Sequence, residues 1–152
     1  MDKRNLNPLI WFKTSAIAML LTAAIHVLSF VTAYEPINDQ EKELINLSQN
    51  YKFDMGAGFY NTYQDHMTAF SVSFTLLHLS SALIILILSK KISDQSAMAS
   101  LNLILLITHL INFLVTLYFT FLPPIIFTGV ITFLLSVSYF LISKKSLKLL
   151  CL

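Results

Sequence analysis

Residues 67–91 read MTAFSVSFTLLHLSSALIILILSKK, a run of 23 uncharged residues that ends at two lysines. About 20 predominantly apolar residues are enough for a helix to cross the hydrocarbon layer of a membrane. The chain holds three more uncharged stretches of 21 to 23 residues, and these are residues 14–34, 97–119 and 122–143. The pattern therefore predicts an all-α fold with four membrane-spanning helices.

The charged residues are divided between the two sides of these stretches. Eight of the ten basic residues precede the first stretch or follow the second and fourth, and only two acids accompany them. The loop 35–66 instead carries six acids and two lysines. Short loops with an excess of lysine and arginine stay in the cytoplasm. We therefore predict that both termini are cytoplasmic and that the loop 35–66 is extracytoplasmic.

Size and composition predict a single transmembrane domain over residues 1–152. The chain has a mean hydropathy of +0.72 and 12% charged residues, which is outside the range of ordinary soluble domains. Four spans leave only one loop and two short tails. The net charge of +2 hides the division between the two sides and does not indicate binding of nucleic acid. The single Cys151 excludes an internal disulfide.

The connections between the stretches predict how the helices are ordered. The last three stretches follow one another closely, which favours antiparallel neighbours in an up-down bundle. In the longer loop, Asn38 or Asp39 is a natural N-cap for a short helix over about residues 38–52. The sequence at residues 55–58 then turns the chain back. The predicted fold is a membrane four-helix bundle with a short extracytoplasmic helix between helices 1 and 2.

Polar residues recur at helical spacing inside the stretches, and three of them are histidines. At a rise of about 1.5 Å per residue, His26, His78 and His109 fall at a similar depth near the middle of the membrane. Ionisable groups at that depth normally face a bundle interior or a cavity. Together with Asn112, the three histidines are the candidate ligand-binding residues, and the histidines are the candidate metal ligands.

Three interpretations of the histidines stay open. Neutral imidazole both donates and accepts a hydrogen bond, so the histidines can join helices without any chemistry. They can line a pocket for a small ligand or for protons. They can also ligate haem or a divalent metal. Because no acid lies inside any stretch to orient an imidazole, the sequence favours a protein that is not an enzyme.

A second candidate site lies at the outer rim of the predicted bundle. Asp65 and His66 immediately precede the second stretch, and Glu35 follows the first. A carboxylate beside an imidazole at a membrane interface suits a cation or a polar lipid headgroup. The alternative interpretation is that Asp65 caps a helix and that the other charges are solvated.

Residues 51–83 read YKFDMGAGFYNTYQDHMTAFSVSFTLLHLSSAL. This segment, with the histidine of the first stretch, resembles a family of small bacterial four-helix membrane proteins of unknown function. The matching positions are His26, Met55, Gly56, Asp65, Phe70 and Phe74. The resemblance covers about residues 15–90. It implies a bacterial inner-membrane location and a four-helix bundle, but no reaction.

The sequence thus predicts a non-enzymatic integral membrane protein. It would act as an accessory subunit or as a binder of a small amphiphilic ligand, with a polar bundle interior that contains the histidines. One alternative is a redox-associated protein that holds haem or a metal, and another is a small transporter that works as an oligomer. The predicted partners are the lipid bilayer and either another membrane protein or a second copy of the chain.

Overall fold

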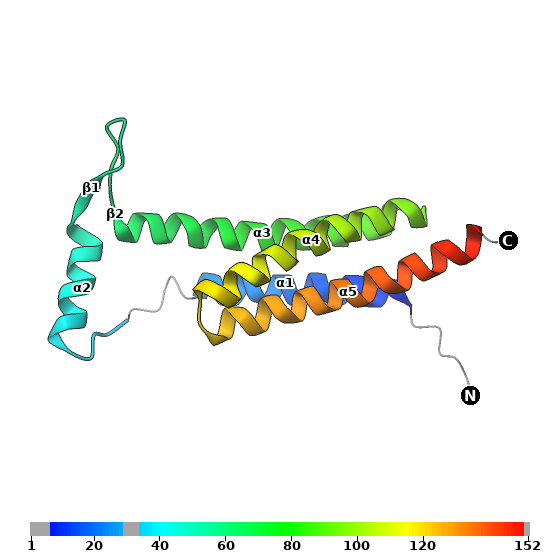
Figure 1. Cartoon of the computed structure of the whole chain (residues 1–152), viewed down its shortest axis with the longest axis horizontal. Helices are drawn as coiled ribbons and strands as arrows, with labels where there is room; N and C mark the ends of the chain where they lie inside the picture. Colours follow the sequence, from blue (N-terminus) through cyan, green and yellow to red (C-terminus); the bar gives the residue numbers. More distant parts are fainter. Residues whose placement is uncertain (1–6, 29–33, 151–152) are drawn as a thin grey trace. The chain divides into compact units, whose positions relative to one another are not determined.

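The structure is a computed structural model in which residues 7–28 and 34–150 are described, the last six of them by their backbone only. Its elements are α1 (Pro8–Leu28), α2 (Asp39–Asn50), β1 (Lys52–Asp54), β2 (Tyr60–Thr62), α3 (Tyr63–Lys91), α4 (Gln95–Phe119) and α5 (Leu122–Leu150) (Figure 1). In the described part of the chain, four helices are long and apolar enough to cross a membrane: α1, α3, α4 and the Leu122–Lys144 part of α5. The predicted all-α fold, with four long apolar helices and one short helix between the first two, is confirmed.

The long helices extend beyond the uncharged stretches that predict them. α1 begins at Pro8, where a proline costs little because the first N–H groups of a helix have no partner within it. α3 continues to Lys91, and two lysines in its last turn are favourable beside the negative end of the helix dipole. The predicted end of the first span falls partly on residues 29–33, which lie outside the described residues.

The chain divides into two compact units. The first, which we call the bundle unit, comprises Met1–Thr22 and His78–Leu152. The second, the loop unit, comprises Ala23–Leu77. Most of α1, the second part of α3 and all of α4 and α5 therefore belong to the bundle unit, whereas α2 and the two strands belong to the loop unit.

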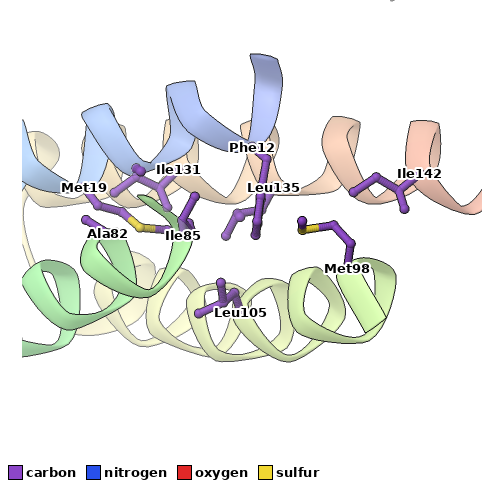
Figure 2. Packing of buried hydrophobic residues seen from close by; sticks show 10 residues of the cluster. Phe12, Met19, Ala82, Ile85, Met98, Leu105, Ile131, Leu135 and Ile142 are labelled. Atoms are coloured by element: carbon purple, nitrogen blue, oxygen red, sulfur yellow. The ribbon is translucent and has the colours of Figure 1, made fainter. Parts of the chain in front are cut away.

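An apolar core holds the bundle unit together, and all four long helices contribute to it (Figure 2). The core residues are Phe12, Ala16, Met19, Ala82, Ile85, Met98, Leu105, Ile131, Leu135 and Ile142. α4 and α5 approach each other closely at Gly129, where an added Cβ would lie 3.1 Å from Cε2 of Phe113. Small residues allow such approaches between membrane helices, where lipid gives no hydrophobic drive for association. Large apolar side chains such as Ile104 and Phe133 remain exposed on the outside, as lipid contact requires.

In the loop unit, local hydrogen bonds define the short elements. The side chain of Asn38 accepts from the backbone N–H of Glu41 at 2.9 Å and so caps α2. β1 and β2 pair antiparallel, with Phe53 opposite Asn61. Gly56 and Gly58 adopt positive φ at the turn, which glycine does without strain. The sequence predicts the turn but not the strands, because three-residue strands are too short to show alternation.

Candidate functional site

Two of the predicted interior residues meet inside the bundle unit. His78 of α3 and His109 of α4 are fully buried. Their ring centroids lie 5.3 Å apart with an interplanar angle of 68°, an edge-to-face contact. The two residues are almost equally far along the chain from the turn at residues 92–94, and neighbouring antiparallel helices bring such positions together. The sequence predicts that these two histidines lie at a similar depth, and in the structure their rings are in direct contact.

A residue of α5, Thr132, also contacts the histidine pair through the backbone of His109. The hydroxyl of Thr132 lies 3.1 Å from the backbone carbonyl of His109 and 2.8 Å from that of Thr128 in its own helix. Because the hydroxyl can donate to the carbonyl of α4, it ties α5 to α4 at the level of the histidine pair. Thr132 is buried with an exposed fraction of 8%.

The face of α4 that carries His109 holds a second buried polar residue, Asn102. Both residues have an exposed fraction of 0%. Neither ring nitrogen of His109, and neither the oxygen nor the nitrogen of the Asn102 amide, has a hydrogen-bond partner among the described residues. Buried polar groups are hydrogen-bonded in the large majority of cases, and the lipid interior supplies no water to compensate. The two side chains thus present unused hydrogen-bonding capacity to the interior.

Asn102 is absent from the candidate residues that the sequence predicts. The available signal was its spacing of seven residues from His109, which places the two side chains on one helix face about 10 Å apart along the axis. Asn112, which is among the predicted residues, is half-buried beside that face. Its side-chain nitrogen is buried and also lacks a partner among the described residues.

The same seven-residue interval leads from Asn102 back to Gln95 at the first turn of α4. Gln95 lines a cleft of about 190 Å³ at this end of the bundle unit. The lining residues are Asn7, Pro8, Leu9, Ile92, Ser93, Asp94, Gln95, Met98 and Ile142. The side-chain oxygen of Gln95 is buried without a hydrogen-bond partner in the described part of the chain. Gln95, Asn102 and His109 therefore form a row of polar residues, the α4 polar row, that begins in this cleft.

His26 lies in the loop unit. Its ring is 4.9 Å from that of Phe74, measured between centroids, and it is hydrogen-bonded to the backbone of Ser71. Both contacts join the last turns of α1 to the first half of α3. The structure thus brings His78 and His109 together and gives His26 a separate set of neighbours in the loop unit.

Two of the predicted outer-rim residues, Asp65 and His66, have structural contacts at the start of α3. The carboxylate of Asp65 accepts from the backbone N–H of Thr62 at 2.9 Å and from its hydroxyl at 2.8 Å. The Thr62 hydroxyl accepts in turn from the N–H of Asp65 at 3.1 Å, which completes a capping box. His66 lies beside the carbonyl of Thr62 at 3.2 Å, with its ring 5.5 Å from that of Phe53. Glu35 is exposed.

The described residues offer limited means to hold a metal. Among them, no group of three or more His, Cys, Asp or Glu side chains lies together in the way that a metal site requires. The pair of His78 and His109 supplies two imidazoles. Because their rings are in edge contact, haem ligated from both sides would require the two rings to separate.

Comparisons with protein-family models, with curated proteins and with solved structures find no match to this chain. A function is therefore inferred from the residues themselves. The candidate functional site is the α4 polar row, with His78 and Thr132 beside it.

Proposed function

We propose that the protein is a non-enzymatic integral membrane protein that binds a small amphiphilic ligand inside its bundle unit. One observation carries the proposal: Asn102 and His109 are fully buried, and their side-chain polar atoms have no hydrogen-bond partner among the described residues. Leaving such groups unpaired costs about 1–3 kcal/mol each. A ligand that pairs with them recovers this free energy and gains affinity from it.

The chemistry of the α4 polar row indicates the class of ligand. An amide and a neutral imidazole each offer one kind of donor and one kind of acceptor, so the ligand needs both. Ile85 and Leu105 belong to the apolar core of the same unit, which favours a molecule with an apolar body. A charged ligand would pay a large desolvation cost without an opposite charge beside it, and no acid lies inside the four uncharged stretches. We therefore propose a neutral amphiphile.

The cleft at Gln95 supports a route of entry. It lies at the end of the bundle unit next to the exposed Lys90 and Lys91, where α3 ends. The distribution of charge in the sequence supports placing this end in the cytoplasm, with both termini on that side. The resemblance to small bacterial membrane proteins supports a bacterial inner membrane as the location.

The test is retention of the ligand during purification. The wild type, Asn102→Leu and the control Ser136→Ala are purified in the same mild detergent, extracted with organic solvent and analysed by mass spectrometry. Ser136 is an exposed residue of α5 whose hydrogen bond among the described residues is to its own helix, at 2.8 Å from the carbonyl of Thr132. We expect one compound in near-equimolar amount in the wild type and the control, and about tenfold less of it in Asn102→Leu. Equal extracts from all three proteins would contradict the proposal.

A second candidate function is favoured by the ring contact between His78 and His109. Two imidazoles from facing helices can ligate a metal or haem iron, which would make the protein redox-associated. The absorbance spectrum of the same purified wild type, together with metal analysis, distinguishes the two functions. A Soret band or a stoichiometric metal that is lost in His109→Leu but kept in Asn102→Leu would support this second function in place of the first.

A further inference from the structure

The short helix α2 has three distinct sides. On one side Ile45 and Ser48 are half-buried, and α2 contacts β2. On the next side Leu44 and Leu47 are 67% and 51% exposed, and Tyr51, the C-cap residue just after the helix, is 64% exposed. Leu44 and Leu47 have the i, i+3 spacing that places side chains in one line along a helix, and Tyr51 follows where the helix ends. We call this line the α2 stripe.

The rest of the helix surface is polar. At about 100° per residue, the arc that runs from the side of Ile45 round to the α2 stripe holds six exposed residues. They are Asp39, Lys42, Glu43, Asn46, Gln49 and Asn50. These side chains need water, whereas burial of the α2 stripe removes apolar surface from water and is favourable. The α2 stripe is therefore the side of the helix that gains from contact with an apolar environment.

The loop unit contains both α2 and the first half of α3, so the directions of these two helices can be compared. In Figure 1, α2 runs across the axis of α3 near the start of that helix. Since α3 crosses the membrane along its own axis, α2 extends along the membrane surface. β2 leads directly into α3, with Tyr60 and Tyr63 exposed at the junction. Tyrosine is enriched at the boundary between membrane and water, so the boundary lies at this height.

We propose that the α2 stripe lies in the headgroup layer of the membrane that the protein spans, on the leaflet next to the start of α3. The bilayer is the proposed partner because α2 is joined through β1 and β2 directly to the spanning helix α3. Amphipathic helices of this kind lie in the plane of the interface with the apolar side buried in the boundary between headgroups and acyl chains. The proposal is independent of the proposed ligand.

The charges of α2 indicate which lipid surface it fits. Asp39, Glu41 and Glu43 outnumber Lys42, so the helix is acidic. Interfacial helices that select anionic lipids carry lysine and arginine instead. The contact of the α2 stripe is therefore apolar in origin and suits a zwitterionic surface.

Two matched tryptophan variants test the proposal in the full chain. In a Trp11→Phe background, Leu47→Trp places the only tryptophan on the α2 stripe, and Gln49→Trp places it on the polar arc. Both proteins are reconstituted into phosphatidylcholine vesicles with and without phosphatidylcholine brominated near the headgroup. The measurements are emission wavelength, quenching by the brominated lipid and quenching by aqueous acrylamide. They are repeated with a quarter of the lipid replaced by phosphatidylglycerol.

We expect the Leu47→Trp protein to emit at shorter wavelength than the Gln49→Trp protein and to be quenched by the brominated lipid. Its indole should also be at least about twofold less accessible to acrylamide. Replacement by phosphatidylglycerol should leave the lipid quenching of the Leu47→Trp protein unchanged or slightly lower. Equal acrylamide quenching of the two proteins would overturn the proposal, because the stripe would then face water. Protection of the Leu47→Trp indole from acrylamide without quenching by the brominated lipid would also overturn it, because a protein surface would then cover the stripe.

Discussion

Two pairs of buried polar residues in the bundle unit differ in how their hydrogen bonds are satisfied. The hydroxyl of Thr116 donates to the carbonyl of Phe113 at 2.9 Å and lies 2.8 Å from the hydroxyl of Thr128 on α5. Asn102 and His109 are buried on the same helix, and their side-chain polar atoms have no such partner in the described part of the chain. Among the described residues, the bundle unit therefore contains a buried threonine pair that is hydrogen-bonded and a buried amide and imidazole that are not.

The difference follows from the geometry of the side chains. A threonine hydroxyl is close enough to its backbone to reach a carbonyl of the preceding turn, so a helix satisfies it locally. The amide of Asn102 and the ring of His109 extend away from the backbone and carry donors and acceptors in fixed directions. They require a partner outside their own helix. Hence the threonines act in packing, and the amide and imidazole are the better candidates for binding.

The largest expected change in stability is at Asn102, the unpaired amide of this comparison. We expect Asn102→Leu to stabilise protein that has been stripped of bound molecules by about 1–3 kcal/mol, since the substitution of similar volume removes an unpaired buried amide. Equilibrium unfolding in mixed micelles measures the change. The exposed Ser136→Ala is the control and should stay within about 0.5 kcal/mol of the wild type. A loss of stability in Asn102→Leu would mean that the amide is satisfied within the protein.

A smaller effect is expected at the hydrogen-bonded threonine pair. Thr116→Val and Thr128→Val should each destabilise the protein by about 0.5–1.5 kcal/mol, because each removes one partner of a buried hydrogen bond. Each hydroxyl also lies within hydrogen-bond distance of a carbonyl of its own helix, and its single proton serves one acceptor at a time, so a double-mutant cycle is needed to isolate the link between α4 and α5. We expect a coupling free energy of about 0.6 kcal/mol, as is typical between membrane helices. Strictly additive effects would show that the two hydroxyls do not stabilise the helix pair.

The sequence predicts the parts of this fold that depend on local patterns. Length and hydropathy predict the four long helices, and the side chain of Asn38 predicts where α2 begins. The meeting of His78 and His109 follows in part from depth, but depth alone does not say which faces of two helices turn toward each other. That choice depends on core packing, for example of Ile85 against its neighbours. The pairing of β1 with β2 is likewise set by partners and not by local periodicity.

The candidate site was harder to predict for a related reason. Asn102, His109 and Thr116 all recur on one face of α4, and periodicity indicates only that this face is buried. Which of them finds a partner depends on what the neighbouring helix places opposite. α5 offers the hydroxyl of Thr128 to Thr116, and no described residue offers a partner to the amide of Asn102. The distinction between a packing contact and a binding residue therefore emerges only in three dimensions.

The smallest expected effect concerns a complete contact at the surface of the loop unit. The carboxylate of Glu41 accepts from the backbone N–H of Ile37 at 2.8 Å and from the hydroxyl of Tyr34 at 2.9 Å. The Ile37 N–H, followed by the Tyr34 hydroxyl, lowers the pKa of Glu41 from its ordinary value of 4.5. The hydrogen bond to Glu41 raises the pKa of Tyr34 above its ordinary value of 10.0. Each shift has its own consequence for the pH range of the contact.

Because the contact lowers the pKa of Glu41, its stabilisation is fully present at pH values above the ordinary pKa of that carboxyl. The stabilisation is lost as the pH falls through the lowered pKa of Glu41. Because the contact raises the pKa of Tyr34, the stabilisation from its hydroxyl is fully present at pH values below the ordinary pKa of tyrosine. This stabilisation is lost as the pH rises through the raised pKa of Tyr34. Protection of the Ile37 amide from hydrogen exchange, corrected for its intrinsic pH dependence, should therefore be greatest between these limits. Glu41→Gln should remove the acid limit and Tyr34→Phe the alkaline one, while Glu43→Gln on the polar arc should change neither. Protection that does not respond to either substitution would show that the carboxylate does not hold the chain before α2.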